Sequence, residues 1–275
     1  MFYQKELDVR EEYKSLLFDF FKAVILEVDF KDEKATEEIN SWVSEKTNNM
    51  IPKLLDFLDP STVMVILNAV YFKGSWLKPF DAENTSLQNF NIRGEKDNYK
   101  KVQTMFMTKR FMFVEEDNYK ALQLPYKGGD ISMLILLPDN ESNLEEFENS
   151  LCPTFLCDLT KNMWEQTVSV ALPKFELEYS KSLKESFLSL GLESIFCQTA
   201  NLEGISETGN LLVSNIIHKA VLVVNEVGSE AAAVSEIEIV PYCMSPDFYA
   251  DHPFMFVIYN VNSNLILFMG RVNDL

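Results

Sequence analysis

The sequence is poor in the residues that most catalytic and metal sites use. Among its 275 residues there are only two histidines, His218 and His252. Two histidines give little material for a Ser-His-Asp triad or a histidine metal site. The sequence also contains no GxSxG, P-loop or CxxC motif. We therefore expect no catalytic residue, no metal and no cofactor, and we expect that the chain is not an enzyme.

Cysteines are too few for a disulfide framework. The four present are Cys152, Cys157, Cys197 and Cys243, whereas small scaffolds stapled by disulfides carry cysteines densely. We expect free thiols. Cys243 lies in a segment predicted to be a loop, but no cationic residue nearby in sequence could activate its thiol.

Positive charge and long apolar runs are also scarce. The sequence has 24 Lys and Arg against 42 Asp and Glu, a formal net charge of -18. This balance disfavours nucleic acid and anionic membranes as partners, although it is compatible with a basic protease. No apolar run approaches the ~20 residues that cross a bilayer. Residues 1–14 lack the basic and then apolar regions of a signal peptide.

What the sequence does contain is enough apolar material for one large core. Hydrophobic residues make up 47% of the chain and aromatic residues 12%. Helical periodicity occurs at 10–21 and 33–46, and apolar strand patterns occur at 23–30, 63–72, 102–114, 121–124 and 132–137. Helices and strands mix without a regular βαβ order, so we predict an α+β domain.

The most informative stretch begins at the apolar run 211–225, which is too apolar on both faces to be a solvated strand. Small residues follow, and from Ser229 the pattern alternates with a period of two. One side carries small and aliphatic residues, whereas the other includes Glu230, Glu236 and Glu238. Pro241 and Pro246 then interrupt regular structure. Such a segment could enter a sheet with its small face against a core and its glutamates in water.

Several motifs in this order resemble the serpin family. The hinge EVGSEAAA (226–233) is similar to the family's mobile hinge, and FYADHPFMFVI (248–258) is similar to its C-terminal signature. Further similar stretches are LNAVYFKGSWLKPF (67–80), VQTMFM (102–107), LPYKGGDISMLILLP (124–138), PKFELEYSKSLKESFLSLGL (173–192) and LILFMGRV (265–272). The resemblance covers essentially the whole chain, and the order and spacing of the motifs make it specific.

The resemblance implies a serpin-like α+β fold over residues 1–275 as a single domain. It would have a large mixed and antiparallel central sheet, a second barrel-like sheet region, and a reactive-centre loop at about 226–246. Compared with the family pattern, the sequence begins within the central sheet. The N-terminal helices are therefore absent from it, and no heparin-type helix can be assigned. A loss of this size would expose surface that is otherwise buried.

The resemblance also implies a mechanism, inhibition of a serine-type endopeptidase by a suicide substrate. The protease cleaves the loop and forms an acyl-enzyme, and the loop then inserts into the main sheet and traps the ester. The hinge residues expected to enter first are Glu226, Gly228, Ser229, Glu230, Ala231, Ala232 and Ala233. An ordinary alanine-rich surface loop is the alternative interpretation, because alanine also favours helix.

Spacing from the hinge glycine, in the common inhibitory form, places the reactive bond between Tyr242 and Cys243. Slippage to Cys243 or Met244 stays open. A tyrosine suits an apolar specificity pocket, so the expected targets are chymotrypsin-like enzymes of the chymase or cathepsin G type, with a cysteine protease as a further option. No Lys or Arg lies between Ser229 and Asp251, which disfavours a trypsin-like target. The alternative is an exposed tyrosine without a protease partner.

Three further positions match the family's sheet-opening residues. Asn68 and His218 match a polar pair that hydrogen-bonds between neighbouring strands, and Trp76 matches a tryptophan beneath the loop's point of entry. His218 could equally be a satisfied core histidine. Asn84 and Asn140 are formal glycosylation acceptors. The resemblance favours an extracellular location, whereas the missing signal peptide leaves a cytoplasmic one open.

Two functions remain from the sequence. The first is the suicide-substrate inhibitor, and the second is a non-inhibitory serpin-like binding or decoy protein whose loop is merely cut. The second is kept open by the missing N-terminal helices. For either, we expect a monomer for which loop-sheet polymerisation is open, because an uncovered sheet edge can pair with another chain.

Overall fold

The computed structural model describes residues 1–94, 98–139, 144–197, 199–207, 211, 213–227 and 245–275. The chain divides into two compact units, each made from two separate stretches. Unit 1 contains Met1–Phe72 and Leu177–Leu222, and unit 2 contains Lys73–Glu176 and Val223–Leu275. Because each unit needs both stretches, neither corresponds to one continuous piece of sequence. A single domain over residues 1–275 remains our proposal.

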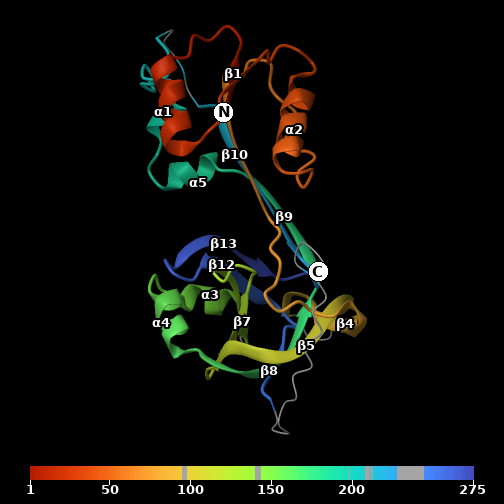
Figure 1. The fold of residues 1–275 in the computed structure, drawn as a ribbon. Coiled ribbons are helices and arrows are strands. Elements are labelled where there is room, and N and C mark those ends of the chain that lie inside the picture. The colour runs from red at the N-terminus through yellow and green to blue at the C-terminus, as the bar shows by residue number, and fades with distance from the viewer. Residues whose placement is uncertain (95–97, 140–143, 198, 208–210, 212, 228–244) are drawn as a thin grey trace. The chain divides into compact units, whose positions relative to one another are not determined.

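Unit 1 carries the helices α1 (Glu11–Phe21), α2 (Ala35–Lys46) and α5 (Lys184–Ser189), and the short 3-10 helix η3 (Ser194–Phe196). Figure 1 shows α1, α2 and α5 beside its sheet. Ala35, Ile39 and Val43 of α2 are buried, and their spacing of four residues places them on one helical face. No residue of α1 is buried, and Phe18, Phe20 and Phe21 are exposed. The two helices thus differ in how well their apolar faces are covered.

Unit 1 is organised around a five-stranded sheet with the order β2-β1-β3-β10-β9. Its strands are β1 (Phe2–Gln4), β2 (Leu26–Val28), β3 (Met64–Phe72), β9 (Phe175–Ser182) and β10 (Asn215–Val224). β1 is antiparallel to β3 and parallel to β2, and β3 is parallel to β10. The sheet is therefore mixed, as expected. Two neighbours in it, β3 and β10, run in the same direction.

Unit 2 contains an eight-stranded sheet with the order β11-β8-β5-β6-β7-β12-β13 and β4 added beside β5. The strands are β4 (Thr85–Asn91), β5 (Tyr99–Glu115), β6 (Tyr119–Pro125), β7 (Ile131–Pro138), β8 (Trp164–Pro173), β11 (Asp247–Tyr249), β12 (Phe254–Asn260) and β13 (Leu265–Val272). The 17 residues of β5 pair in turn with β4, β8 and β6. This one strand therefore links most of the sheet.

The core of unit 2 lies along β7 and β12, whose central residues are buried on both faces. Helices α3 (Leu144–Ser150) and α4 (Phe155–Asn162) cover one face, and Phe147 and Leu159 pack against Leu134, Leu136 and Val257. The 3-10 helices η1 (Ala82–Asn84) and η2 (Ile92–Gly94) flank β4. Gly270 allows β13 to approach β12, because a Cβ there would lie 2.8 Å from the ring of Phe256.

The α+β prediction is confirmed, and most predicted elements lie within a few residues of their expected bounds. The strand expected at 23–30 is an exception, because only Leu26–Val28 is extended and paired. Lys22 ends α1 with a φ of 51°, and the three residues that follow connect the helix to β2. An apolar pattern alone could not indicate that the residues on either side of Leu26–Val28 lack a pairing strand.

Candidate functional site

The parallel pair β3 and β10 is the first component of the candidate site. Eight residues of β10 face eight of β3 in an unbroken register, from Asn215 opposite Val65 to Leu222 opposite Phe72. Parallel pairs are slightly less stable per residue than antiparallel pairs. Beyond Met64 and Val65, the residues of β3 are partly exposed or exposed. These two strands therefore form a region of the sheet that is both parallel and incompletely covered.

Asn68 and His218 lie directly opposite each other in this register. The Nδ1 atom of His218 is 2.9 Å from the Oδ1 atom of Asn68. Because an amide oxygen can only accept, Nδ1 carries the hydrogen in this arrangement. The ring of Tyr179 on β9 has its centroid 6.4 Å from that of His218. The two residues predicted from the sequence are thus brought together, and their side chains bridge β3 and β10.

Trp76 lies where β10 ends, and only 2% of it is exposed. Its indole Nε1–H donates to the backbone oxygen of Asn225 over 2.8 Å. Its ring stacks on that of Tyr126, with the centroids 4.4 Å apart and the planes 11° from parallel. Burial raises the pKa of Tyr126 far above its ordinary value, so this phenol stays neutral. The first residue after β10 is therefore anchored to a rigid aromatic pair.

Glu226, the first predicted hinge residue, is held from several sides. Its carboxylate accepts a hydrogen bond from Thr85 Oγ1 over 2.9 Å, and it pairs with Lys174 Nζ at 2.9 Å. Its backbone oxygen accepts from the Phe80 amide over 3.0 Å. Only 8% of Glu226 is exposed. The start of the hinge is thus attached to three other segments of unit 2.

The charge of Glu226 is stabilised by these contacts. Burial by itself would raise the pKa of the carboxyl group, but the hydrogen bonds from Lys174 and Thr85 outweigh burial and hold the pKa below its ordinary value. Hydrogen bonds to an ionised group are stronger than those between neutral groups. Glu226 is therefore a charged anchor, and acid would weaken it.

Several predicted residues lie outside the described residues. These are Gly228, Ser229, Glu230, Ala231, Ala232 and Ala233 of the hinge, Tyr242 and Cys243 of the expected reactive bond, and the acceptor Asn140. Their roles remain predictions from the sequence. Asn84, the other glycosylation acceptor, is the last residue of η1 and is exposed.

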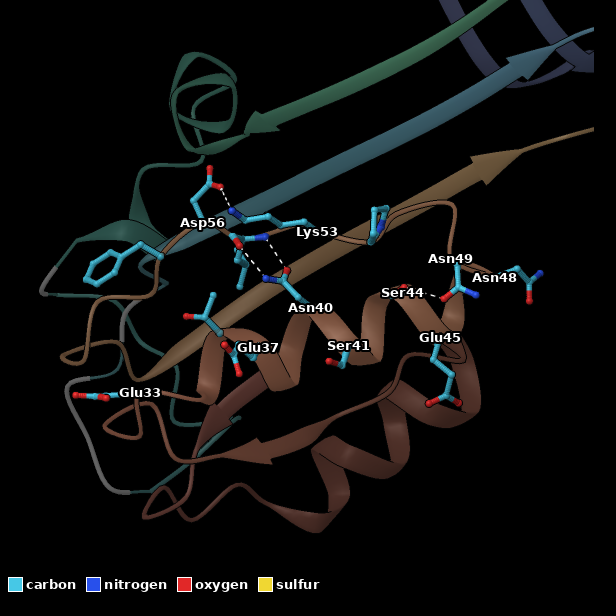
Figure 2. A pocket seen from close by; sticks show the side chains of 14 residues that line it. Glu33, Glu37, Asn40, Ser41, Ser44, Glu45, Asn48, Asn49, Lys53 and Asp56 are labelled. Carbon is cyan, nitrogen blue, oxygen red and sulfur yellow. Dashed lines mark hydrogen bonds and ion pairs between the residues drawn. The ribbon is translucent and has the colours of Figure 1, made fainter.

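A large hollow with a polar lining is separate from these residues. It measures about 1050 Å³ and lies in unit 1 between α2 and the segment 48–57. Figure 2 shows Asn40 reaching across, where it donates to Leu55 O over 2.8 Å and accepts from the Leu54 and Leu55 amides. Among its charged lining residues the carboxylates outnumber the single lysine, Lys53, which pairs with Asp56 at 2.7 Å. None of the residues predicted from the sequence as functional lines this hollow.

Catalytic and metal sites find no support among the residues that the structure describes. No group of three His, Cys, Asp or Glu side chains there could hold a metal ion. The ring of His252 lies 2.7 Å from Asp251 Oδ1 and 2.6 Å from Pro138 O, so it ties the start of β12 to the end of β7. Cys152, Cys157 and Cys197 are free thiols, as expected. Within the same residues, no helix is long and apolar enough to span a membrane.

Sequence reasoning missed the partners of the hinge. Lys174 follows β8, and Thr85 begins β4, so they are far from Glu226 in sequence. Tyr126, which stacks on Trp76, lies in the stretch LPYKGGDISMLILLP (124–138), and nothing in that stretch marks it as a partner of Trp76. No local pattern pairs such distant residues, because only the fold brings them together. The excess of acidic over basic residues also gives no indication of which acids are paired.

Comparison with known proteins places this geometry in context. The model of the family described as Serpin (serine protease inhibitor) matches residues 1–275. Iripin-5 from Ixodes ricinus is 39% identical over 277 residues, which cover 98% of this chain and 70% of that protein. Intracellular coagulation inhibitor 1 from Tachypleus tridentatus is 40% identical, with 99% of this chain and 67% of that protein covered. The chain thus spans about two thirds of these relatives.

Solved structures agree with the sequence comparison. Uncleaved ovalbumin superimposes with a TM-score of 0.89 at 32% identity, and the match covers 100% of this chain and 72% of ovalbumin. Mouse protein-Z dependent protease inhibitor gives a TM-score of 0.89 at 30% identity, covering 99% of this chain and 72% of that one. The chain therefore belongs to the serpin family, a family of protease inhibitors and not of enzymes.

Proposed function

We propose that this chain inhibits serine endopeptidases as a suicide substrate, with Tyr242–Cys243 as the reactive bond and chymotrypsin-like proteases as the targets. The segment that follows Val227 would be cleaved while bound and would then enter the sheet between β3 and β10. The acyl-enzyme would be trapped before water hydrolyses the ester. This mechanism extends the family's general inhibitory function to particular residues of this chain.

The parallel pairing of β3 with β10 is the observation that carries the proposal. A chain that turns back after β10 runs antiparallel to it, and it would also run antiparallel to β3. Insertion would therefore replace one parallel pair with two antiparallel pairs, which are the more stable kind. Each new hydrogen bond contributes only about 0.5–1.5 kcal/mol net. A strand makes many of them, so the sum can drive an irreversible change.

The base of the hinge supports the same mechanism. Trp76 and Glu226 are buried and fixed by hydrogen bonds, so the segment beyond them starts from a defined position. In the sequence, Ser229, Ala231, Ala233 and Ser235 are all small, and they alternate with Glu230, Ala232 and Val234. A small residue at each inward position would let the sheet close around the new strand. A large charged residue at Ser229 would instead be buried early at a high cost.

Two incubations test the proposal. Wild-type chain mixed with chymotrypsin should give a covalent complex that survives denaturing electrophoresis. Ser229→Arg should still be cleaved but should shift the products from complex to nicked chain, because the first inward position can no longer enter. Glu236→Arg is the matched control, since it lies on the outward side of the same pattern. A wild-type chain that yields only nicked product would end the proposal.

A second function is a binding or decoy protein that is cut without trapping the protease. The observation that favours it is the incomplete cover over β3, because its partly exposed apolar side chains could bind another polypeptide in place of the chain's own loop. Thyroxine-binding globulin, solved with thyroxine, is a structural relative at 28% identity with a TM-score of 0.90. Thermal melting separates the two functions, since only an inhibitor should melt much higher after its loop is cut.

For location, we propose the cytoplasm in place of the extracellular space that the family resemblance favours. Two relatives from Tachypleus tridentatus are named intracellular coagulation inhibitors. The free thiols of Cys152, Cys157 and Cys197 are compatible with a reducing compartment. Imaging of the tagged chain in its own cells would test this, and a signal confined to the culture medium would contradict it.

A further inference from the structure

The strands β9 and β10 run side by side in unit 1 (Figure 1), and side chains join them at three places within their described lengths. The pairs are Ser182 with Asn215, Tyr179 with His218, and Glu178 with Lys219. The residue numbers fall along β9 as they rise along β10, so the two strands are antiparallel. β10 therefore has an antiparallel neighbour on one side and the parallel neighbour β3 on the other.

Two of these pairs lie on opposite faces of the sheet, because successive residues of a strand point to opposite sides. On one face the ring centroids of Tyr179 and His218 are 6.4 Å apart, within the range of favourable aromatic contacts. On the other face Lys219 pairs with Glu178 and donates to Lys53 O over 2.6 Å. We call the pairs Tyr179–His218 and Glu178–Lys219 the β9 clamp, because they hold β10 to β9 from both faces.

The ion pair is the strong part of the β9 clamp. The side chain of Lys219 is only 9% exposed. A buried ammonium group has lost its water, and it is tolerated where an opposite charge and further acceptors replace that water. The carboxylate of Glu178 and the carbonyl of Lys53 do this. Moving β9 away from β10 would remove the opposite charge from a buried cation, so opening the sheet on this side is costly.

The other side of β10 is held more weakly. Its pairing with β3 is parallel, which is the slightly less stable arrangement. Asn68 and His218 bridge these two strands through a hydrogen bond of 2.9 Å, and Asn68 is exposed. Water can replace a bond to an exposed amide at little cost. The two sides of β10 therefore differ in the charge and the burial of the groups that join them.

We propose that Glu178 and Tyr179 are positioning residues, which keep β10 attached to β9 while the sheet opens between β3 and β10. This inference rests on the proposed function, because it concerns the same insertion step. β9 and β10 would stay together as one body, and the new strand would pair with the free edge of β10. Without the β9 clamp the sheet could open on either side of β10. The β9 clamp thus decides where the loop enters and takes no part in cleavage.

The first experiment needs no protease. Successive amides of β10 point alternately to β3 and to β9, so residue-resolved hydrogen exchange of the whole chain reports opening on each side. In wild type the amides toward β9 should exchange more slowly than those toward β3. Glu178→Gln/Tyr179→Ala should speed exchange of the β9-facing amides by about 10-fold or more, the effect of losing roughly one hydrogen bond to a charged group. Equal protection on both sides of β10 in wild type would overturn the inference.

Two variants separate a positioning role from a general loss of stability. Glu176→Gln removes an exposed charge two residues from Glu178 on the same face of β9, and it should leave exchange on both sides at the wild-type rates. Tyr179→Phe keeps the ring and should also behave as wild type. If Glu178→Gln/Tyr179→Ala speeds exchange equally on the two sides of β10, these residues are merely structural and the inference is wrong.

The second experiment uses active chymotrypsin and engineered disulfides between facing residues. A β9–β10 disulfide from Ser182→Cys/Asn215→Cys should leave the ratio of covalent complex to nicked chain unchanged, because these strands stay together. A β3–β10 disulfide from Asn68→Cys/His218→Cys should nearly abolish the complex, and reducing it should restore complex formation. Loss of complex with the β9–β10 disulfide would overturn the inference. If wild type forms no complex but shows the exchange difference, and the double variant loses it, the β9 clamp stands and inhibition fails.

Discussion

The strands β7 and β3 are similar in sequence but differ in how they are covered. β7 (ISMLILLP) and β3 (MVILNAVYF) are both mostly aliphatic. In β7 every residue after Ile131 is buried, with neighbours on both sides and α3 and α4 nearby. In β3 only Met64 and Val65 are buried. Apolar composition therefore indicates a strand that can be buried, and its neighbours decide whether it is.

This difference separates a region whose apolar side chains are already buried from one whose apolar side chains can still gain contacts. Buried apolar area stabilises a fold by about 25 cal/mol per Å², so β7 and β12 have already obtained that stabilisation. β3 and β10 retain partly exposed apolar side chains that a further strand or other polypeptide could cover. The same comparison applies to polar residues, because Glu226 is buried and fully engaged whereas Asn68 is exposed.

The largest effect should come from removing aliphatic volume in the two strands. Ile135→Ala in β7, where Ile135 is 0% exposed, should cost about 2–5 kcal/mol in the free energy of unfolding, because it leaves a cavity. Ile66→Ala in β3 makes the same chemical change at a partly exposed position and should cost less than half as much. Urea unfolding followed by circular dichroism compares them. Equal losses would show that β3 is as well packed as β7.

Removing the charge at the hinge should have the next largest effect. Glu226→Gln keeps the shape of the side chain but removes the charge that accepts from Lys174 and Thr85. We expect a loss of about 1.5–3 kcal/mol, the usual range for hydrogen bonds to charged groups. Glu176→Gln, which removes an exposed charge, is the control. Unfolding monitored by tryptophan fluorescence would measure the loss, and similar values for the two variants would contradict the anchor.

Acid should weaken the same anchor gradually. The pKa of Glu226 is lowered in the folded chain from its ordinary value of 4.5. Its contribution to stability is therefore fully present above that value and is lost as the pH falls through the lowered pKa. Between pH 6 and pH 3, wild type should lose more stability than Glu226→Gln, so the gap between them should narrow. A gap that stays constant over this range would mean that the carboxylate is not stabilised by folding.

The smallest effect concerns the exposed polar pair. A double-mutant cycle with Asn68→Ala and His218→Ala should give a coupling of about 0.5–1.5 kcal/mol, the net contribution of an ordinary hydrogen bond, and partial exposure should place it near the lower end. Thermal unfolding of the four proteins measures it. A coupling well above 2 kcal/mol would mean that this pair belongs with the buried anchor at Glu226.

Much of the fold could be predicted because periodic apolar segments are local features. The prediction for 63–72 differs from β3 by one residue, and the one for 132–137 differs from β7 by one residue at each end. Among the strands that were missed, β4 is largely polar and β11 has only three residues. Their extended form depends on pairing with β5 and β8. Short or polar strands carry little signal of their own.

The sequence was sufficient to predict which residues belong to the candidate site, but not which residues they contact. Family resemblance indicated Asn68, Trp76, His218 and Glu226, and the fold then determined their environments. The pairing of Glu226 with Lys174 joins residues more than fifty positions apart, and no spacing rule reaches that far. The pair of Glu178 with Lys219 is likewise a product of the register between two strands. Such sites depend on which residues face each other, which a single sequence does not encode locally.

The length of β5 has a mechanical consequence. Its first part pairs with β4, its middle with β8 and its end with β6, so one continuous backbone joins three partners. A tensile load on any of them passes along this strand instead of through side-chain packing alone. A single cut near the midpoint of β5 would thus leave the strands of this sheet on two fragments that no longer share a backbone.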